Sequence, residues 1–286
     1  ESCYYQVLLT LIGPNDSMIS VAPTYQQHYS IPESIGAEVN ILPLLPENEF
    51  LPDLNQLKEM VTPNTKLITI NNPNNPSGSL LSEAMLKEIS EIARSVDAYV
   101  LSDEVYRGIS EDGSYMPSIV DVYEKGISVG SMSKALSLAG LRLGWIASKD
   151  QDLLDACRER RDYDTISCGV LDDHFASVAL EHKEAIFARN REIVLSNRKI
   201  LDEWVTGESH VSYVKPRAGN TALVYYDIDM DSTEFCTELL KETGVFYTPG
   251  ECFDLKNCFR IGYAFDSKTL AEGLRRTSEF LAKCGN

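Results

Sequence analysis

The chain carries the stretch Ile127-Ser128-Val129-Gly130-Ser131-Met132-Ser133-Lys134, and Arg142 follows eight residues after Lys134. The apolar run at 127–129 predicts a short buried strand that ends at Ser131. Two hydroxyls, an amine and a guanidinium this close together can hold a phosphate and place an amine beside it. A serine-rich turn followed by two solvated cations has the same composition, so the other strand ends must decide between the two interpretations.

Further apolar strands are predicted on both sides of this stretch, with helical segments between them, for example at 51–61 and 81–96. The strands lack a clean alternation of apolar and polar residues, which indicates burial on both faces. A mostly parallel sheet between layers of helices, the α/β class, is therefore expected. The predicted strands are 18–21, 37–42, 66–70, 98–101, 127–129 and 143–147.

The pattern changes from about Gln151, where a charged helix precedes one long or broken helix at 172–205. After it, fewer strands alternate with helices, which predicts a smaller α+β unit. We therefore expect a large domain at residues 1–185 and a small C-terminal domain at residues 186–286. The strands of this part are predicted at 222–227, before Gly250 and at 259–261, and its helices at 233–243 and 269–282.

The composition excludes several classes of protein. The 286 residues include 43 acidic and 26 basic side chains, a formal net charge of −17, which argues against binding to nucleic acid or anionic membranes. Seven scattered cysteines form no CxxC pair, so we expect reduced thiols and neither disulfides nor a metal site. There is no run of 18 apolar residues and no signal peptide, and a cytoplasmic location is expected.

The unusual polar and aromatic residues lie at or just after the ends of predicted strands. These residues are Tyr25, Asn75, Asp103, Ser131 and Lys134. In parallel α/β sheets, ligands bind beyond the carboxyl ends of the strands. The pattern alone therefore predicts a binding site at this edge of the sheet.

Four motifs occur in a fixed order along the chain: Asn75-Pro76-Ser77-Gly78, Asp103-Glu104-Val105-Tyr106, Ser131-x-Ser133-Lys134 with Arg142, and Phe259-Arg260-Ile261-Gly262. Each alone is a weak signal, but together they are specific. With them the chain resembles the class I/II aminotransferases, pyridoxal-phosphate (PLP) enzymes of fold type I that include aspartate aminotransferase. The resemblance covers nearly all of the sequence.

The resemblance implies the catalytic residues. Lys134 matches the lysine that forms a Schiff base with PLP, and the neighbouring cation Arg142 favours loss of its proton. Asp103 matches the carboxylate that pairs with the pyridine nitrogen, so that the ring can accept electrons. Tyr106 and Asn75 match the pair that hydrogen-bonds the 3-oxygen of the cofactor.

The resemblance also implies the remaining cofactor contacts. Tyr25 matches the aromatic residue that stacks on the pyridine ring. Ser131, Ser133 and Arg142 match the phosphate site, where a planar guanidinium binds two oxygens at once. Backbone N–H groups of a glycine-rich loop complete this site in the family. By alignment, that loop would end near Glu1, and because the chain begins inside an apolar helix we expect residues before Glu1 to be missing.

For the substrate, the resemblance implies that Arg260 binds the α-carboxylate, with Asn75 beside it. A charge between the apolar neighbours of Arg260 also requires a partner on physical grounds. The loop at 215–220 corresponds to one that approaches the substrate in the family. Arg217 or Asn220 is therefore a candidate for selecting the substrate side chain.

The reaction predicted from this resemblance is transamination between an L-amino acid and a 2-keto acid, with a Schiff base at Lys134. One alternative keeps PLP but changes the reaction to that of a lyase, a decarboxylase or a cyclising enzyme of amino-acid metabolism. Another is the PLP-sensing domain of a transcription regulator. The resemblance further implies a homodimer, with small-molecule substrates and neither nucleic acid nor membrane as partner.

Overall fold

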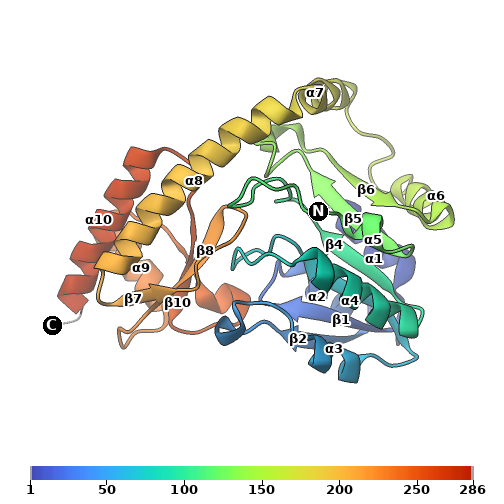
Figure 1. Cartoon of the computed structure of the whole chain (residues 1–286), viewed down its shortest axis with the longest axis horizontal. Coiled ribbons are helices and arrows are strands. Elements are labelled where there is room, and N and C mark those ends of the chain that lie inside the picture. The colour runs from blue at the N-terminus through green and yellow to red at the C-terminus, as the bar shows by residue number, and fades with distance from the viewer. Residues whose placement is uncertain (1, 285–286) are drawn as a thin grey trace.

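The computed structural model of the chain describes residues 2–284 and contains two β-sheets joined by a long helix (Figure 1). Within the described residues, no helix is long and apolar enough to span a membrane. The order of the elements along the chain alternates strands and helices through the first sheet. The predicted α/β class is confirmed.

The first sheet has six strands in the order β2-β1-β3-β4-β5-β6. The first five in this order run parallel, and β6 is antiparallel to β5, to which it is connected by residues 132–143 without a crossover α-helix. Asn71, Asp103 and Val129 lie opposite one another on three neighbouring strands, so these carboxyl ends are level. The strands are β1 (Ser17–Ala22), β2 (Glu38–Pro43), β3 (Thr65–Asn71), β4 (Tyr99–Asp103), β5 (Gly126–Ser131) and β6 (Gly144–Ser148).

Helices cover both faces of this sheet, which explains the continuous apolar strands. Leu67 packs in one core with residues of α1 and α6, whereas its neighbour Ile68 packs in another core with residues of α3, α4 and α5. Asp53 and Ser82 cap α3 and α4 by accepting backbone N–H groups. The helices are α1 (Ser2–Leu11), α2 (Gln27–Ser34), α3 (Leu54–Met60), α4 (Glu83–Ser95), α5 (Ile119–Val122) and α6 (Gln151–Arg161).

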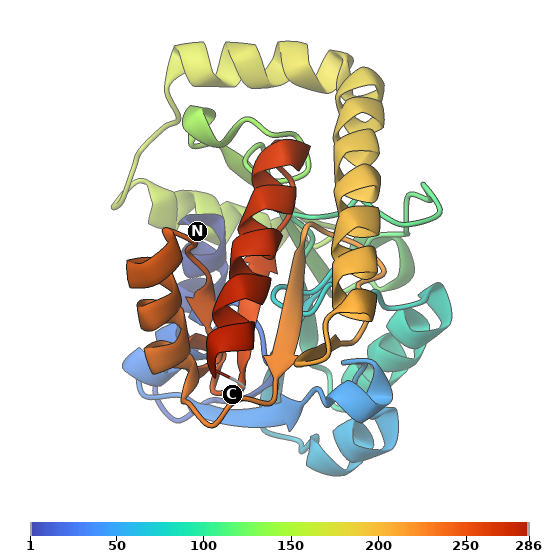
Figure 2. The same cartoon turned by 90° about the vertical axis from the view of Figure 1, so that its left-hand side faces the viewer.

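The long helical segment is broken at His182 into α7 (Val170–Glu181) and α8 (Lys183–Gly207). From this break, α8 extends alongside the second sheet and packs next to α10 (Figure 2). The domain boundary near residue 185 stays a prediction, and it falls within the first turn of α8.

The second sheet is antiparallel, in the order β7-β8-β10-β9, with α9 and α10 packed against it. Aromatic rings fill its core, and the rings of Tyr247 and Phe259 stack with their centres 4.3 Å apart. This part forms the expected smaller α+β layer. Its elements are β7 (Val211–Tyr213), β8 (Thr221–Tyr226), α9 (Ser232–Thr243), β9 (Thr248–Pro249), β10 (Cys258–Gly262) and α10 (Ser267–Cys284).

Candidate active site

Asp103 is the last residue of β4, and its carboxylate lies at the carboxyl edge of the sheet. One oxygen, Oδ1, accepts a hydrogen bond from the backbone N–H of Val105 at 3.1 Å. The other, Oδ2, lies 3.5 Å from Nε2 of His28. The backbone of Val105 and the ring of His28 thus hold the two carboxylate oxygens. The side chain of Asp103 is still 12% exposed, so part of it remains accessible to a ligand.

His28 is a site residue that the sequence analysis missed. It lies on α2, three residues after Tyr25, and is completely buried. Its ring stacks on that of Tyr4, with centroids 4.4 Å apart. Nε2 has no hydrogen-bond partner among the described residues and faces the Asp103 carboxylate. The four histidines lack metal-ligand spacing, and only the position of His28 close after Tyr25 could have pointed to it.

Arg260 and Asn75 meet although 185 residues separate them in the sequence. Nη1 of Arg260 donates to Oδ1 of Asn75 at 3.1 Å, and Nη2 donates to Oγ1 of Thr248 at 3.2 Å. The guanidinium also lies 5.3 Å from the ring centre of Phe253. Among residues 2–284, Arg260 has no acidic partner. This half-buried cation is therefore oriented by neutral groups and can accept an anionic ligand.

Tyr106 lies in the same region and is buried. Burial raises the pKa of its phenol to about 12, with a further rise from Asp103 and Tyr25 and an opposing effect from Arg260. At neutral pH the phenol is therefore protonated and can donate a hydrogen bond. The structure thus brings Asp103, Tyr106, Tyr25, Asn75 and Arg260 into one region.

The residues at the end of β5 form the second half of the site. Oγ of Ser131 accepts a hydrogen bond from the backbone N–H of Ser133 at 3.2 Å. Lys134 is exposed and has no side-chain partner among the described residues. Arg142 is also exposed, and its Nη1 donates to the carbonyl of Ala139 at 2.8 Å. The predicted phosphate-binding groups therefore lie on one loop, with Arg142 turned toward its own backbone.

These groups fit a phosphorylated pyridine aldehyde such as PLP. The phosphate requires hydroxyls and a cation, which Ser131, Ser133 and Arg142 provide. The aldehyde requires an unpaired amine, which Lys134 provides, and the ring nitrogen requires a carboxylate, which Asp103 provides. The glycine-rich loop expected to end near Glu1 falls outside the described residues.

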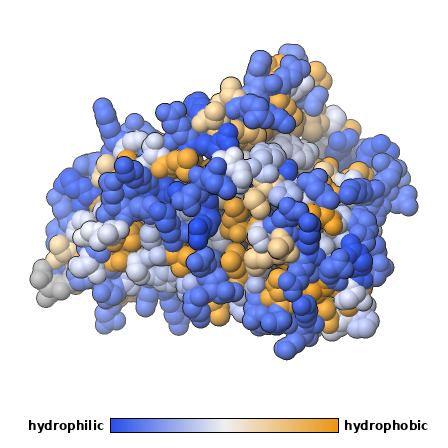
Figure 3. Space-filling model, in the orientation of Figure 1, coloured by the Kyte–Doolittle hydropathy of each residue, from blue (hydrophilic) through white to orange (hydrophobic). Residues whose placement is uncertain are grey.

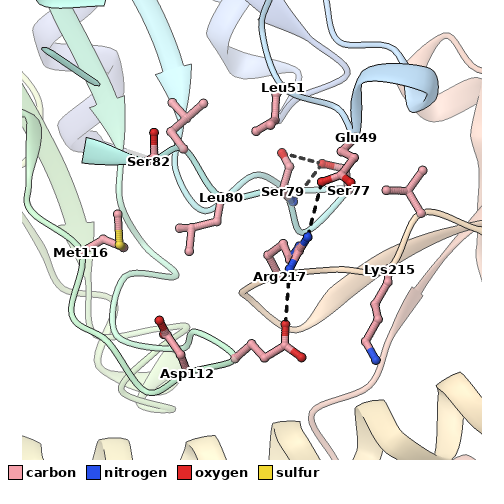
Figure 4. Close-up of a pocket in the computed structure, with 13 residues that line it drawn as sticks. Glu49, Leu51, Ser77, Ser79, Leu80, Ser82, Asp112, Met116, Lys215 and Arg217 are labelled. Carbon is pink, nitrogen blue, oxygen red and sulfur yellow. Dashed lines mark hydrogen bonds and ion pairs between the residues drawn. The ribbon is translucent and has the colours of Figure 1, made fainter. Parts of the chain in front are cut away.

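The two candidates for side-chain selection lie in different places. Arg217 lines a cavity of about 490 Å³ together with Ser77 and Ser79 (Figure 4). There it pairs with Glu49 at 3.6 Å and with Glu111 at 4.0 Å. Asn220 instead lines a second cavity, of about 430 Å³, together with Lys134. Of the two candidates, only Asn220 therefore lines the same cavity as Lys134.

Comparison with known proteins identifies the family. Residues 3–276 match the model of the aminotransferase class I and II family. A PLP-dependent aminotransferase from Streptococcus suis has a similar structure, with a TM-score of 0.95 and 46% identity, covering 98% of this chain and 74% of that chain. Capreomycidine synthase from Streptomyces vinaceus is 31% identical over 267 residues, covering 93% of this chain and 68% of the relative. Aspartate aminotransferase from Sulfolobus acidocaldarius is 28% identical over 292 residues, covering 97% of this chain and 72% of the relative.

The chain belongs to the aminotransferase class I and II family. The family and its aspartate aminotransferase members use pyridoxal 5'-phosphate, so the predicted cofactor is confirmed. The prediction of a PLP-dependent enzyme of the aminotransferase class is confirmed as well.

Proposed function

We propose that this enzyme transfers an amino group between an L-amino acid and a 2-keto acid. The observation that carries the proposal is Arg260, a half-buried guanidinium with only neutral hydrogen-bond partners beside the catalytic groups. An α-carboxylate is the bidentate anion that such a fork binds best. Asn75 supports Arg260 from the side of the first sheet, so the substrate is held where the two sheets meet.

PLP, when bound, supplies an electron-accepting ring that stabilises negative charge at the α-carbon of the amino acid. Lys134 would hold the cofactor covalently through Nζ. When the substrate amine takes this place, Nζ of Lys134 would be available as a general base that takes up the α-proton and gives it back. Asp103 would hold the proton of the ring nitrogen, and His28, whose Nε2 lies 3.5 Å from Oδ2 of Asp103, would orient this carboxylate. A second half-reaction with a keto acid reverses these steps, which gives ping-pong kinetics.

The remaining residues position the cofactor in this proposal. Ser131, Ser133 and Arg142 would bind the phosphate, Tyr25 would pack against the ring, and Tyr106 would donate a hydrogen bond to the ring oxygen. The protonated state of the Tyr106 phenol supports this last role, because its pKa of about 12 lies far above neutral pH.

A homodimer in the cytoplasm belongs to the same proposal. The apolar face of α7 supports the dimer, because Val170, Leu171 and Phe175 are exposed there. Figure 3 shows hydrophobic residues among the hydrophilic surface at the end of the molecule where α7 lies.

The first test is the position of the covalent bond. The protein is incubated with PLP, reduced with borohydride and mapped by mass spectrometry. We expect the cofactor on Lys134, no labelled peptide in Lys134→Ala, and normal labelling in Lys149→Ala, which removes another exposed lysine. Labelling of the Lys134→Ala protein to the wild-type extent would contradict the assignment.

The second test is the product, because some relatives carry other names. One is named capreomycidine synthase, at 31% identity, and another S-alkyl-thiohydroximate lyase, at 26% identity. These names favour a cyclising enzyme or lyase as the second candidate. A keto acid formed from the donor without free ammonia supports transamination. Ammonia with pyruvate, carbon dioxide or a cyclised product identifies the alternative instead.

A further inference from the structure

The cavity in Figure 4 is separate from the candidate active site, because neither Arg260 nor any residue assigned to PLP lines it. Its volume of about 490 Å³ is sufficient for a small metabolite. Its walls are formed by residues from the segments 77–82, 111–116 and 214–217, together with Glu49 and Leu51. The cavity therefore lies where loops of the first sheet meet the chain that leads into β8.

Arg217 has a fixed backbone and an unused head group. Its N–H donates to the carbonyl of Gly78 at 2.8 Å, and its carbonyl accepts the N–H of Glu111 at 3.0 Å. The guanidinium lies 3.6 Å from the Glu49 carboxylate and 4.0 Å from that of Glu111, and it donates no hydrogen bond to any of residues 2–284. Arg217 and Glu49 thus offer a cation and a carboxylate side by side, with the donors of the guanidinium available to a ligand.

Asp112 lines the cavity from another segment and forms no ion pair within the described part of the chain. Its Oδ1 accepts the N–H of Ser114 at 2.9 Å. Hydrogen bonds from Ser114 lower the pKa of the Asp112 carboxyl, so it is ionised at neutral pH. The neighbouring Glu111, in contrast, accepts from Arg198 at 2.8 Å. Asp112 is therefore available to a second cationic group.

Apolar side chains connect these two charged positions. Figure 4 shows Leu80 between Arg217 and Met116, with Asp112 on the same side as Met116. Leu80 and Met116 are only half-buried, so methylene groups of a ligand can pack against them. Leu51 also lines the cavity.

We propose that this cavity is a second, non-catalytic binding site for a free basic amino acid such as L-lysine. The α-carboxylate binds Arg217, and the α-ammonium binds the adjacent Glu49. The aliphatic chain packs along Leu80 and Met116, and the terminal cation binds Asp112. An acidic side chain in this position would face an unpaired carboxylate and be repelled.

Ligand-observed NMR titrations of the full chain measure the binding of L-lysine and of two matched probes. The protein is loaded with PLP and reduced with borohydride, so that no aldehyde remains to react with an amine. L-norleucine has the same carbon chain without the terminal ammonium, and 1,5-diaminopentane lacks the carboxylate. We expect L-lysine to bind about 3- to 10-fold more tightly than either probe, because each probe lacks one charge-assisted contact at an exposed site.

Two substitutions separate the two ends of the site. Asp112→Asn should weaken L-lysine binding by about 3- to 10-fold and change L-norleucine binding by less than about 2-fold. Arg217→Gln should weaken the binding of both amino acids without weakening that of 1,5-diaminopentane. Arg275→Gln is the matched control, because Arg275 is similarly exposed and pairs with Glu272 and Glu279 outside the cavity. It should leave the binding of all three compounds unchanged.

Arg260→Gln distinguishes this cavity from the active site. It should change L-lysine binding by less than about 2-fold. A loss of binding in Arg260→Gln but not in Arg217→Gln overturns the inference, because the compounds then occupy the active site. Equal affinity of the wild-type protein for all three compounds overturns it as well. No compound reacts with the reduced protein, so these outcomes are independent of whether the enzyme is a transaminase.

Discussion

At the scale of single residues, His28 offers a sharp test of how the Asp103 carboxylate is held. His28→Phe keeps a ring stacked against Tyr4 but removes Nε2, which lies 3.5 Å from Asp103. Because an orienting group is lost while an apolar ring fills the space, we expect kcat to fall by about 10-fold or more. The free energy of unfolding should change by less than about 1.5 kcal/mol.

Steady-state kinetics and urea unfolding of the loaded enzyme measure the two effects. Tyr4→Phe is the control, because it retains both the stacked ring and Nε2 of His28 and removes only the phenol oxygen of Tyr4. If kcat in His28→Phe stays within 2-fold of wild type, which is about 0.4 kcal/mol, His28 has no positioning role.

How far the sequence predicts the site depends on the kind of residue. Asp103 and Asn75 belong to motifs at strand ends, and a parallel sheet brings strand ends together, so their proximity followed from the pattern. His28 could not be found this way, because its role arises from burial between α1 and β4. The direction of Arg142 depends on the conformation of its loop, which no spacing rule reports.

At the scale of elements, most strands and helices were predictable because each carries a long apolar pattern. The helix α5 and the strand β7 were missed, since four and three residues are too few to show a period. The break at His182 leaves the apolar pattern of the two helices nearly continuous, so the sequence indicated only a long or broken helix. The direction of β6, antiparallel to β5, depends on the path of the loop that connects the two strands. The apolar pattern of β6 does not report this direction.

Glu104 joins three elements of the first sheet. Its Oε1 accepts hydrogen bonds from the hydroxyl of Ser118 and the N–H of Ile119, both at 3.0 Å, and its Oε2 accepts from Ser128 at 2.8 Å. Burial raises the pKa of the Glu104 carboxyl, and these hydrogen bonds oppose the rise only in part. Glu104 therefore links α5 to β4 and β5, next to Asp103 in the chain.

The raised pKa gives a testable dependence of stability on pH. Above pH 4.5, the ordinary pKa of a glutamate carboxyl, the unfolded chain loses the proton of Glu104 while the folded chain still binds it. The contribution of Glu104 to the stability of the folded state is therefore complete below pH 4.5. It is lost as the pH rises through the raised pKa of the folded state. The stability of wild type relative to Glu104→Gln should therefore decrease from about pH 4 to about pH 8. Urea unfolding across this pH range measures the difference in the free energy of unfolding between wild type and Glu104→Gln.

Glu192→Gln serves as the control, because Glu192 is exposed on α8 and its side chain forms no hydrogen bond or ion pair with the described residues. Its stability difference from wild type should be independent of pH. A difference for Glu104→Gln that grows in favour of wild type with rising pH would contradict the raised pKa.

At the scale of the whole molecule, the site exists only where the two sheets are held together. The carbonyl of Gly78 accepts the N–H groups of Arg217 and Ala218 at 2.8 and 3.0 Å. A side chain at position 78 would meet Pro216 at 2.4 Å, and the backbone there has φ of +73°, so glycine is required for this approach. The motif that contains Asn75 thus also joins the first sheet to the second.

The assembly of two such molecules is the remaining prediction at this scale. Helix α7 exposes Val170 by 83% and Phe175 by 55%, and exposed apolar side chains gathered on one helix are a candidate contact for a protein partner. If a second copy covers this face, Phe175→Asp should shift the protein from dimer toward monomer, since an unpaired charge would be buried at the contact. Light scattering at several protein concentrations measures the molar mass.

Phe246→Asp is the control, because Phe246 is 72% exposed beside the second sheet, away from α7. It should leave the molar mass unchanged. Wild-type protein that stays monomeric at every concentration refutes the dimer. A dimer that persists equally in Phe175→Asp and Phe246→Asp shows that the interface lies elsewhere than on α7. An unpaired aspartate buried in the interface would weaken the dimer by several kcal/mol, whereas an exposed aspartate would change its stability little.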